Sequence, residues 1–108
     1  MNYVYAASVA DVQPGNMKAI LVEGKEILLV NVGGQIFAIQ RFCPHAGADL
    51  CAGKIADSKV VCPKHDAAFD LATGEAVAQA KLLFLKFPTK RAGTYRVKVE
   101  NDSIFVEA

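Results

Sequence analysis

The chain carries two similar stretches, Cys43-Pro44-His45 and Cys62-Pro63-Lys64-His65, separated by 16 residues (46–61). Each stretch places a thiol and an imidazole within one short loop, and both groups are soft or borderline ligands for transition metals. The proline after each cysteine fixes φ and removes a backbone N–H, which stiffens the turn. The two stretches together predict one metal centre that takes its ligands from both loops.

The segment around these stretches, residues 41–80, differs in character from the rest of the chain. It holds all three cysteines and both histidines, and it is rich in turn-forming residues. We expect Gly47 and Gly53 to let the backbone approach a bulky cofactor. Thr73-Gly74 is expected to close a turn after Phe69-Asp70.

Outside this segment the sequence favours an all-β domain. Val, Ile, Tyr and Phe are spread over short runs that Gly, Asp, Asn and Pro separate, which is typical of strands joined by tight turns. Gly33-Gly34 and Asn101-Asp102 predict two hairpins, because these pairs tolerate positive φ. The predicted strands span residues 3–8, 17–22, 26–32, 35–40, 59–62, 68–71, 95–99 and 103–107.

Two details of this pattern are testable. In residues 95–99, Tyr95, Val97 and Val99 alternate with Arg96 and Lys98, which predicts one buried and one wet face. Helical periodicity is weak throughout; residues 76–85 could form a turn or two of helix, but their Leu and Phe content leads back toward strand.

Composition limits the function classes. With 108 residues the chain has room for one domain, residues 1–108. Its 12 basic and 11 acidic residues give a net charge of +1, so no bulk field favours nucleic acid or an anionic membrane. The N-terminus shows no export signal and no apolar run is long enough to span a bilayer, so we expect a soluble, cytoplasmic protein. An odd number of cysteines in such a chain favours metal ligation over a disulfide scaffold.

The two stretches resemble the Rieske [2Fe–2S] family, whose pattern is Cys-x-His, 15 to 17 residues, then Cys-x-x-His. Phe69-Asp70 with Thr73-Gly74 is also typical of that family. The resemblance implies that one [2Fe–2S] cluster is bound, with Cys43 and Cys62 on one iron and His45 and His65 on the other. It also implies a Rieske-type antiparallel β sandwich with a small inserted cluster-binding subdomain, about residues 41–80.

The chain departs from the high-potential members of that family. In the Rieske proteins of respiratory cytochrome complexes, a disulfide joins the two loops, and Ser and Tyr hydroxyls donate hydrogen bonds toward the cluster. The corresponding positions here are Ala48, Lys64, Ala67 and Phe69. Fewer donors destabilise the reduced state, so we expect a reduction potential near the lower end of the range of roughly −150 to +300 mV.

Two further departures concern Cys51 and the loop after Thr73-Gly74. Cys51 matches no bridge position, and we interpret it as a small buried side chain, the alternative being a ligand in place of a histidine. The family's proline-containing covering loop is replaced here by Glu75-Ala76-Val77-Ala78-Gln79-Ala80. Shielding of the cluster is then expected from Leu82, Leu83 or Phe84.

Two non-redox interpretations remain open. A Cys₂His₂ set in a short chain can hold structural zinc, although the Cys-x-x-Cys start and His-x-x-x-His helix of zinc fingers are missing. The four residues could also be ordinary side chains without a metal, although their gathering in two turn-rich loops argues against it.

The histidine count separates an electron carrier from an oxygenase. The mononuclear iron of a Rieske oxygenase needs two further histidines and a carboxylate, whereas this chain has only His45 and His65. No Gly-x-Gly-x-x-Gly segment offers a flavin or nicotinamide site. We therefore expect an electron-transfer protein, not an enzyme, that binds a flavoprotein ferredoxin reductase and a terminal oxygenase transiently. The alternative is the small subunit of a reductase such as assimilatory nitrite reductase.

Charged residues suggest where partners could bind. Residues 76–99 contain six basic residues and no acid: Lys81, Lys86, Lys90, Arg91, Arg96 and Lys98. They form either a solvated strand face or a steering patch for an acidic partner. Near the predicted cluster the charges of Arg41, Asp49, Lys64 and Asp66 are mixed, which favours a small, transient contact.

Overall fold

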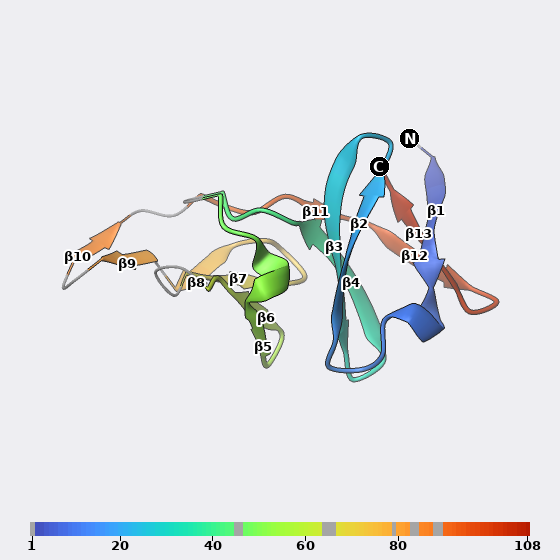
Figure 1. Ribbon diagram of the computed structural model, residues 1–108, viewed down its shortest axis with the longest axis horizontal. Coiled ribbons are helices and arrows are strands. Elements are labelled where there is room, and N and C mark those ends of the chain that lie inside the picture. Colours follow the sequence, from blue (N-terminus) through green and yellow to red (C-terminus); the bar gives the residue numbers. More distant parts are fainter. Residues whose placement is uncertain (1, 45–46, 64–66, 79, 83–84, 88–89) are drawn as a thin grey trace.

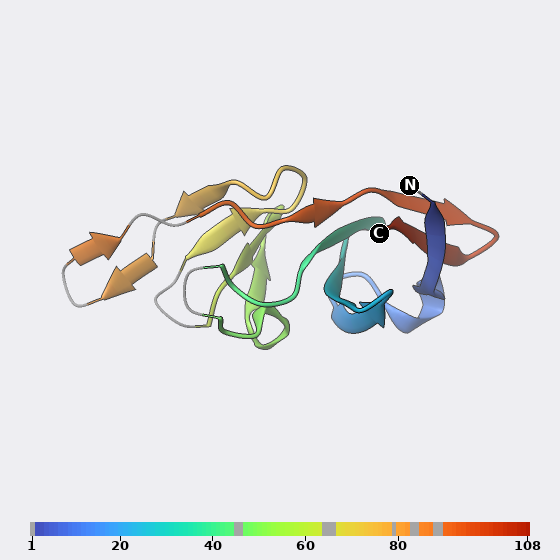
Figure 2. The same cartoon turned by 90° about the horizontal axis from the view of Figure 1, so that it is seen from above.

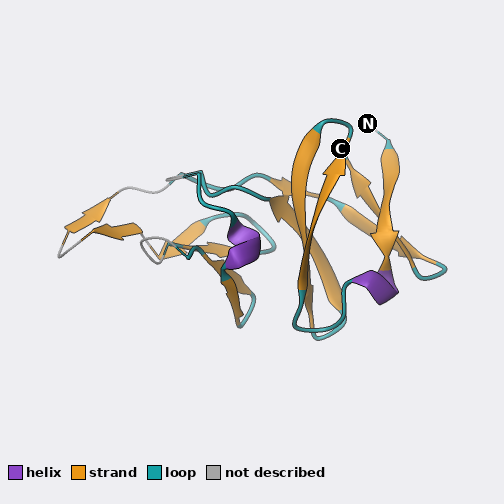
Figure 3. Ribbon diagram, in the orientation of Figure 1, coloured by secondary structure: helices purple, strands orange, loops and turns teal. Residues whose placement is uncertain are grey.

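The computed structural model describes residues 2–44, 47–63, 67–78, 80–82, 85–87 and 90–108 (Figure 1). Its regular structure is almost entirely strand, with two single turns of 3₁₀ helix, η1 (Val9–Asp11) and η2 (Leu50–Ala52) (Figure 3). The predicted all-β, antiparallel class is confirmed. No helix in these described ranges has the length and apolar character that crossing a bilayer requires.

Seven strands form two sheets at one end of the molecule. The four-stranded sheet has the order β11-β4-β3-β2 and the three-stranded sheet the order β1-β13-β12, all antiparallel. Their bounds are β1 Tyr3–Ser8, β2 Met17–Val22, β3 Lys25–Val32, β4 Gln35–Gln40, β11 Thr94–Tyr95, β12 Val97–Glu100 and β13 Ser103–Glu107.

Both predicted hairpins are confirmed. Val32 pairs with Gln35 across Gly33-Gly34, and Glu100 pairs with Ser103 across Asn101-Asp102. All four turn residues have positive φ, which a two-residue hairpin turn of the primed type requires and which Gly, Asn and Asp tolerate best.

Strand β3 is buried on both faces, which explains its unbroken apolar run. Ile27 and Leu29 point into a core between the two sheets, the sandwich core, together with Ala7, Val12, Val22, Ile36, Ala38, Ile104 and Val106. Leu28 and Val30 point to the other side, into a second core that we call the loop core. Because successive side chains of a strand face opposite sides, β3 is the wall that separates these two cores.

The buried side-chain amide of Asn31 holds the end of β3 in place. Asn31 is only 1% exposed, and its Nδ2 donates to the Val12 carbonyl oxygen at 2.8 Å. Its Oδ1 accepts a hydrogen bond from the Gly34 backbone N–H, also at 2.8 Å. The side chain therefore ties the β3–β4 turn to the segment after η1.

The chain leaves the sandwich after Gln40 and returns to it at Thr94. The intervening residues form a four-stranded antiparallel sheet, β5-β6-β7-β8, and a two-stranded ribbon, β10-β9. Figure 2 shows the sandwich, the small sheet and the ribbon following one another along the 48 Å long axis of the molecule. The bounds are β5 Lys54–Ala56, β6 Lys59–Val61, β7 Ala68–Asp70, β8 Ala76–Ala78, β9 Ala80–Leu82 and β10 Leu85–Phe87.

The structure corrects three details of the prediction. The single strand expected over residues 95–99 is broken at Arg96, where the chain passes from the four-stranded to the three-stranded sheet. Val99 is not on a buried face, since it is 48% exposed. Strands β5, β8, β9 and β10 were not among the predicted strands, although the described backbone within residues 76–85 is strand, as the Leu and Phe content of that stretch indicated.

Candidate metal centre

Cys43 and Cys62 occupy equivalent places in two loops of equal span. The Cys43 N–H donates to the Ala48 carbonyl oxygen at 2.8 Å, and the Cys62 N–H donates to the Ala67 carbonyl oxygen at 2.7 Å. We call residues 43–48 the first loop and residues 62–67 the second loop. The backbone N–H of each cysteine is therefore hydrogen-bonded to the residue five positions later, so the two loops are closed by equivalent bonds.

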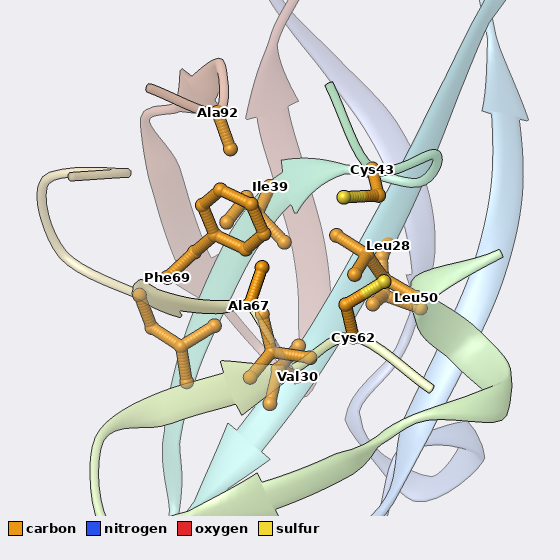
Figure 4. Close-up of a cluster of buried hydrophobic side chains, with 11 residues drawn as sticks. Leu28, Val30, Ile39, Cys43, Leu50, Cys62, Ala67, Phe69 and Ala92 are labelled. Atoms are coloured by element: carbon orange, nitrogen blue, oxygen red, sulfur yellow. The ribbon is translucent and has the colours of Figure 1, made fainter. Parts of the chain in front are cut away.

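The two cysteines lie in one apolar environment. Cys43 is 3% and Cys62 is 1% exposed, and both belong to the loop core with Leu28, Val30 and Leu50. Figure 4 shows both cysteine side chains among the buried side chains of this cluster. Two thiols brought from separate loops into a site closed to water suit a soft metal centre that carries little charge.

The predicted histidine ligands, His45 and His65, lie outside the described residues, as do Lys64 and Asp66. Within the described part of the chain, no group of three or more His, Cys, Asp and Glu side chains gathers. The structure buries the two predicted cysteine ligands in the same cluster, and the complete ligand set stays a prediction.

Small and aromatic side chains complete the described surroundings of the thiols. Ala67 and Phe69 are fully buried in the loop core, and Ala48 packs against it. The predicted turn after Phe69 is confirmed, because the Asp70 carboxylate accepts hydrogen bonds from two following backbone N–H groups and Gly74 has a φ of 80°. The hydroxyl-free composition noted in the sequence is thus present at the buried positions themselves.

Arg41 and Asp49 hold the base of the first loop. The Arg41 Nη2 and Nε atoms bond the two Asp49 carboxylate oxygens at 2.8 and 3.2 Å, and Nη1 bonds Glu26 Oε2 of β3 at 2.7 Å. These hydrogen bonds from Arg41, helped by one from the Cys51 N–H, hold the pKa of Asp49 below its usual value. The same contacts raise the pKa of Arg41. The two side chains are paired with each other and yet remain 29% and 32% exposed, so the mixed-charge contact surface predicted around them stays a prediction.

Gly53 has a role that differs from the one expected, and Cys51 is less buried than expected. A side chain at Gly53 would collide with the Val61 carbonyl oxygen, so the close approach is between two backbone segments and not to a cofactor. Gly47 has a positive φ of 70° with open space beside it, and its predicted approach to a cofactor stays a prediction. Cys51 is half-buried, and it packs against the edge of the loop core. Leu83, Phe84 and the side chain of Leu82, the predicted shield, lie outside the described residues.

Two of the six basic residues within residues 76–99, Arg91 and Lys98, contact other groups of the chain. Arg91 Nε donates to the Thr73 carbonyl oxygen at 2.8 Å. Lys98 lies 5.3 Å from the ring centre of Tyr3 and 3.5 Å from the Glu100 carboxylate. Among the described side chains these two cations therefore have partners within the chain, which weakens the steering-patch interpretation for them.

The site that sequence reasoning missed is this pairing of Arg41 with Asp49. The available signal was two opposite charges placed on either side of the first loop, just where a closed loop brings its ends together.

Known proteins share both the sequence pattern and the fold. Residues 2–83 match the Rieske [2Fe–2S] domain family. The ferredoxin subunit of the 3-phenylpropionate/cinnamic acid dioxygenase of Shigella flexneri is 37% identical over 109 residues, covering 99% of this chain and 94% of that protein. A ferredoxin of Sphingomonas yanoikuyae has a similar structure, with a TM-score of 0.84, 29% identity and 99% of both chains covered.

A further solved structure shows how widely the fold is used. A protein described as a putative small subunit of NADPH nitrite reductase superposes with a TM-score of 0.82 over 100% of both chains, at 20% identity. At that identity the likeness shows the fold alone. The match over residues 2–83 and the 37% identical relative show more: this chain belongs to the Rieske family, and its cofactor is one Rieske-type [2Fe–2S] cluster.

Proposed function

We propose that this chain is a one-electron carrier that accepts an electron from a flavoprotein ferredoxin reductase and delivers it to a terminal oxygenase. Cys43 and Cys62 would hold one iron of the cluster, and His45 and His65 the other. The observation that carries the proposal is the burial of both thiols in the same loop core, in two loops closed by an equivalent backbone hydrogen bond. The dioxygenase ferredoxin relative supports the choice of partners.

The donor set fits the cofactor. When bound, a [2Fe–2S] cluster supplies reversible one-electron chemistry, and two imidazoles in place of two thiolates raise its potential above that of all-cysteine clusters. The residues of the chain bind it, exclude water from it and set its environment. With Ala48, Ala67 and Phe69 around the thiols, side-chain hydroxyls are absent from these three positions. We therefore expect a potential near the lower end of roughly −150 to +300 mV.

Residues 41–80 would act as the cluster-binding subdomain of the single domain 1–108. The rest of the chemistry is expected to occur on partner proteins, since the sequence has two histidines in all and cannot supply the two more that a mononuclear iron site needs. We place the carrier in the cytoplasm, where thiols such as Cys51 stay reduced.

The experiment is a redox titration of the purified protein, followed by electron paramagnetic resonance (EPR) and by electron transfer to a dioxygenase-type oxygenase. We expect a Rieske-type EPR signal on one-electron reduction, and its loss in Cys43→Ser and His65→Ala. The matched control, Cys51→Ser, should keep the signal. A protein that binds zinc and gives no EPR signal would refute the proposal.

The reductase-subunit alternative is tested by association. A carrier should bind its reductase weakly and turn over many times, whereas a subunit should copurify with a large partner in a fixed ratio. A stoichiometric complex that survives gel filtration would favour the subunit interpretation over the carrier.

A further inference from the structure

The two loops that hold the cysteines are supported in different ways. The second loop joins β6 to β7, and a ladder of three residue pairs, Lys59 with Asp70 to Val61 with Ala68, holds its base. The first loop has no such ladder: its base is one isolated bridge between Phe42 and Asp49, made by the Cys43–Ala48 hydrogen bond and by the bond from the Leu50 N–H to the Arg41 carbonyl oxygen. In the described structure, something other than a sheet must therefore fix the first loop.

Arg41 is placed to supply that support. Its backbone bonds β3 and the opposite side of the loop base, since its N–H donates to the Glu26 carbonyl oxygen at 3.2 Å and its carbonyl oxygen accepts the Leu50 N–H at 2.8 Å. Its guanidinium then joins three segments: it binds both oxygens of Asp49 at the end of the loop and one oxygen of Glu26 on β3. The guanidinium carbon of Arg41 also lies 5.0 Å from the centre of the ring of Phe42, the residue that stands between Arg41 and Cys43 in the sequence.

Asp49 also links Arg41 to η2, the turn that follows it. One of its oxygens, Oδ1, accepts the Cys51 N–H at 3.0 Å and so caps η2. A planar guanidinium can bind two carboxylates in this way because its donors are fixed in a fork, which a lysine ammonium lacks. The arrangement ties the beginning of the first loop, its end and the β3 wall to one side chain.

We propose that Arg41 is a positioning residue for the cluster, which holds the first loop against β3 through Asp49 and Glu26 and so fixes Cys43 relative to Cys62. The inference rests on the proposed function for the role of Cys43 as a ligand. Its distinguishing claim is that geometry, not charge, is what Arg41 contributes. Arg41→Lys keeps the charge and loses the fork, so it should behave like Arg41→Gln.

The test compares iron release from the holoprotein to a ferrous chelator, with the EPR spectrum of the reduced protein recorded alongside. Arg41→Lys, Arg41→Gln and Asp49→Asn should each release iron about 10- to 100-fold faster than wild type, the usual effect of removing a group that orients a metal ligand. Their EPR lines should shift. Arg91→Gln removes one exposed cation and one hydrogen bond elsewhere, and it should change the release rate less than about twofold.

The pairing adds a second criterion. Because Asp49 acts through Arg41, the double variant Arg41→Gln/Asp49→Asn should release iron no faster than Arg41→Gln alone. Multiplying effects would overturn the proposal, as would an Arg41→Lys protein with the wild-type release rate and spectrum. If Arg41→Gln does not fold, the Arg41→Lys and Asp49→Asn variants still test the proposal.

These outcomes separate the two proposals. A wild-type protein without a Rieske signal would refute the proposed function. A wild-type protein with the signal, together with Arg41→Lys and Asp49→Asn proteins that keep iron as firmly as wild type, would refute only the role of Arg41.

Discussion

Replacing Leu28 by alanine should weaken both the fold and the metal centre, whereas replacing Leu29 should weaken the fold alone. The two leucines are neighbours on β3 and both are 0% exposed. Leu28 belongs to the loop core with Cys43 and Cys62, and Leu29 belongs to the sandwich core. The pair is therefore a matched comparison: the two side chains are equal in chemistry and burial and differ only in the face of β3 on which they lie.

The expected magnitudes follow from this burial. Each substitution removes most of a fully buried side chain and should lower the free energy of unfolding by about 2–5 kcal/mol. For a domain of this size that corresponds to a fall in Tm of at least about 8 °C. Only the Leu28 variant leaves a cavity beside the thiols, so it should release iron to a chelator about tenfold faster than the Leu29 variant.

The assay combines a urea titration followed by far-UV circular dichroism with cluster absorbance under native, oxygen-free conditions. Iron release is measured well below the unfolding midpoint, so that global unfolding contributes little. Equal release rates from two variants of equal stability would refute the division into two cores. They would show that the protein responds to either cavity as one unit.

Three further substitutions test single contacts. Gly53→Ala should lower the free energy of unfolding by about 1–3 kcal/mol, because its methyl group meets the Val61 carbonyl oxygen; an unchanged urea midpoint would contradict that contact. Asn31→Ala should cost at least about 2 kcal/mol in a thermal melt, since two backbone groups lose their buried partner, and a loss within error would speak against it. The pKa of Asp49 is lowered by its bonds to Arg41, so its stabilising effect is complete above the ordinary value of 3.8 and is lost as the pH falls through the folded value. The gap in urea midpoint between wild type and Asp49→Asn should therefore be full at neutral pH and shrink below pH 3.8, and a gap independent of pH would exclude this titration.

Local chemistry was enough to predict the regular strands. Gly33-Gly34 and Asn101-Asp102 specify their turns through the backbone conformations they tolerate, and the flanking apolar residues then set the register. The break at Arg96 was not predictable in this way. The alternation around Tyr95 and Val97 is that of one continuous strand. The strand is broken only because two different sheets each offer a free edge, one to residues 94–95 and the other to residues 97–100.

The site, too, has features that the local sequence predicts and features that depend on the folded chain. The burial of Cys43 and Cys62 follows from their position in loops that fold back on an apolar sheet, and the family pattern pointed to both. The pairing of Arg41 with Asp49 depends on the closure of the first loop, which brings together residues that look solvated in the sequence. Gly53 was misinterpreted for a related reason, since the group it lets approach is a strand distant in sequence, not a ligand.

The two points at which the chain leaves and re-enters the sandwich lie next to each other. The Gln40 N–H donates to the Gly93 carbonyl oxygen at 2.8 Å, and the Gly93 N–H donates to Gln40 Oε1 at 2.7 Å. A segment whose ends meet can be transplanted as a cassette into another β scaffold without stretching its host. The cassette would not travel alone, however, because its inner surface is completed by Leu28 and Val30 of β3. A recipient sheet would need apolar residues at those two places, and a donor sheet stripped of the cassette would need polar ones to remain soluble.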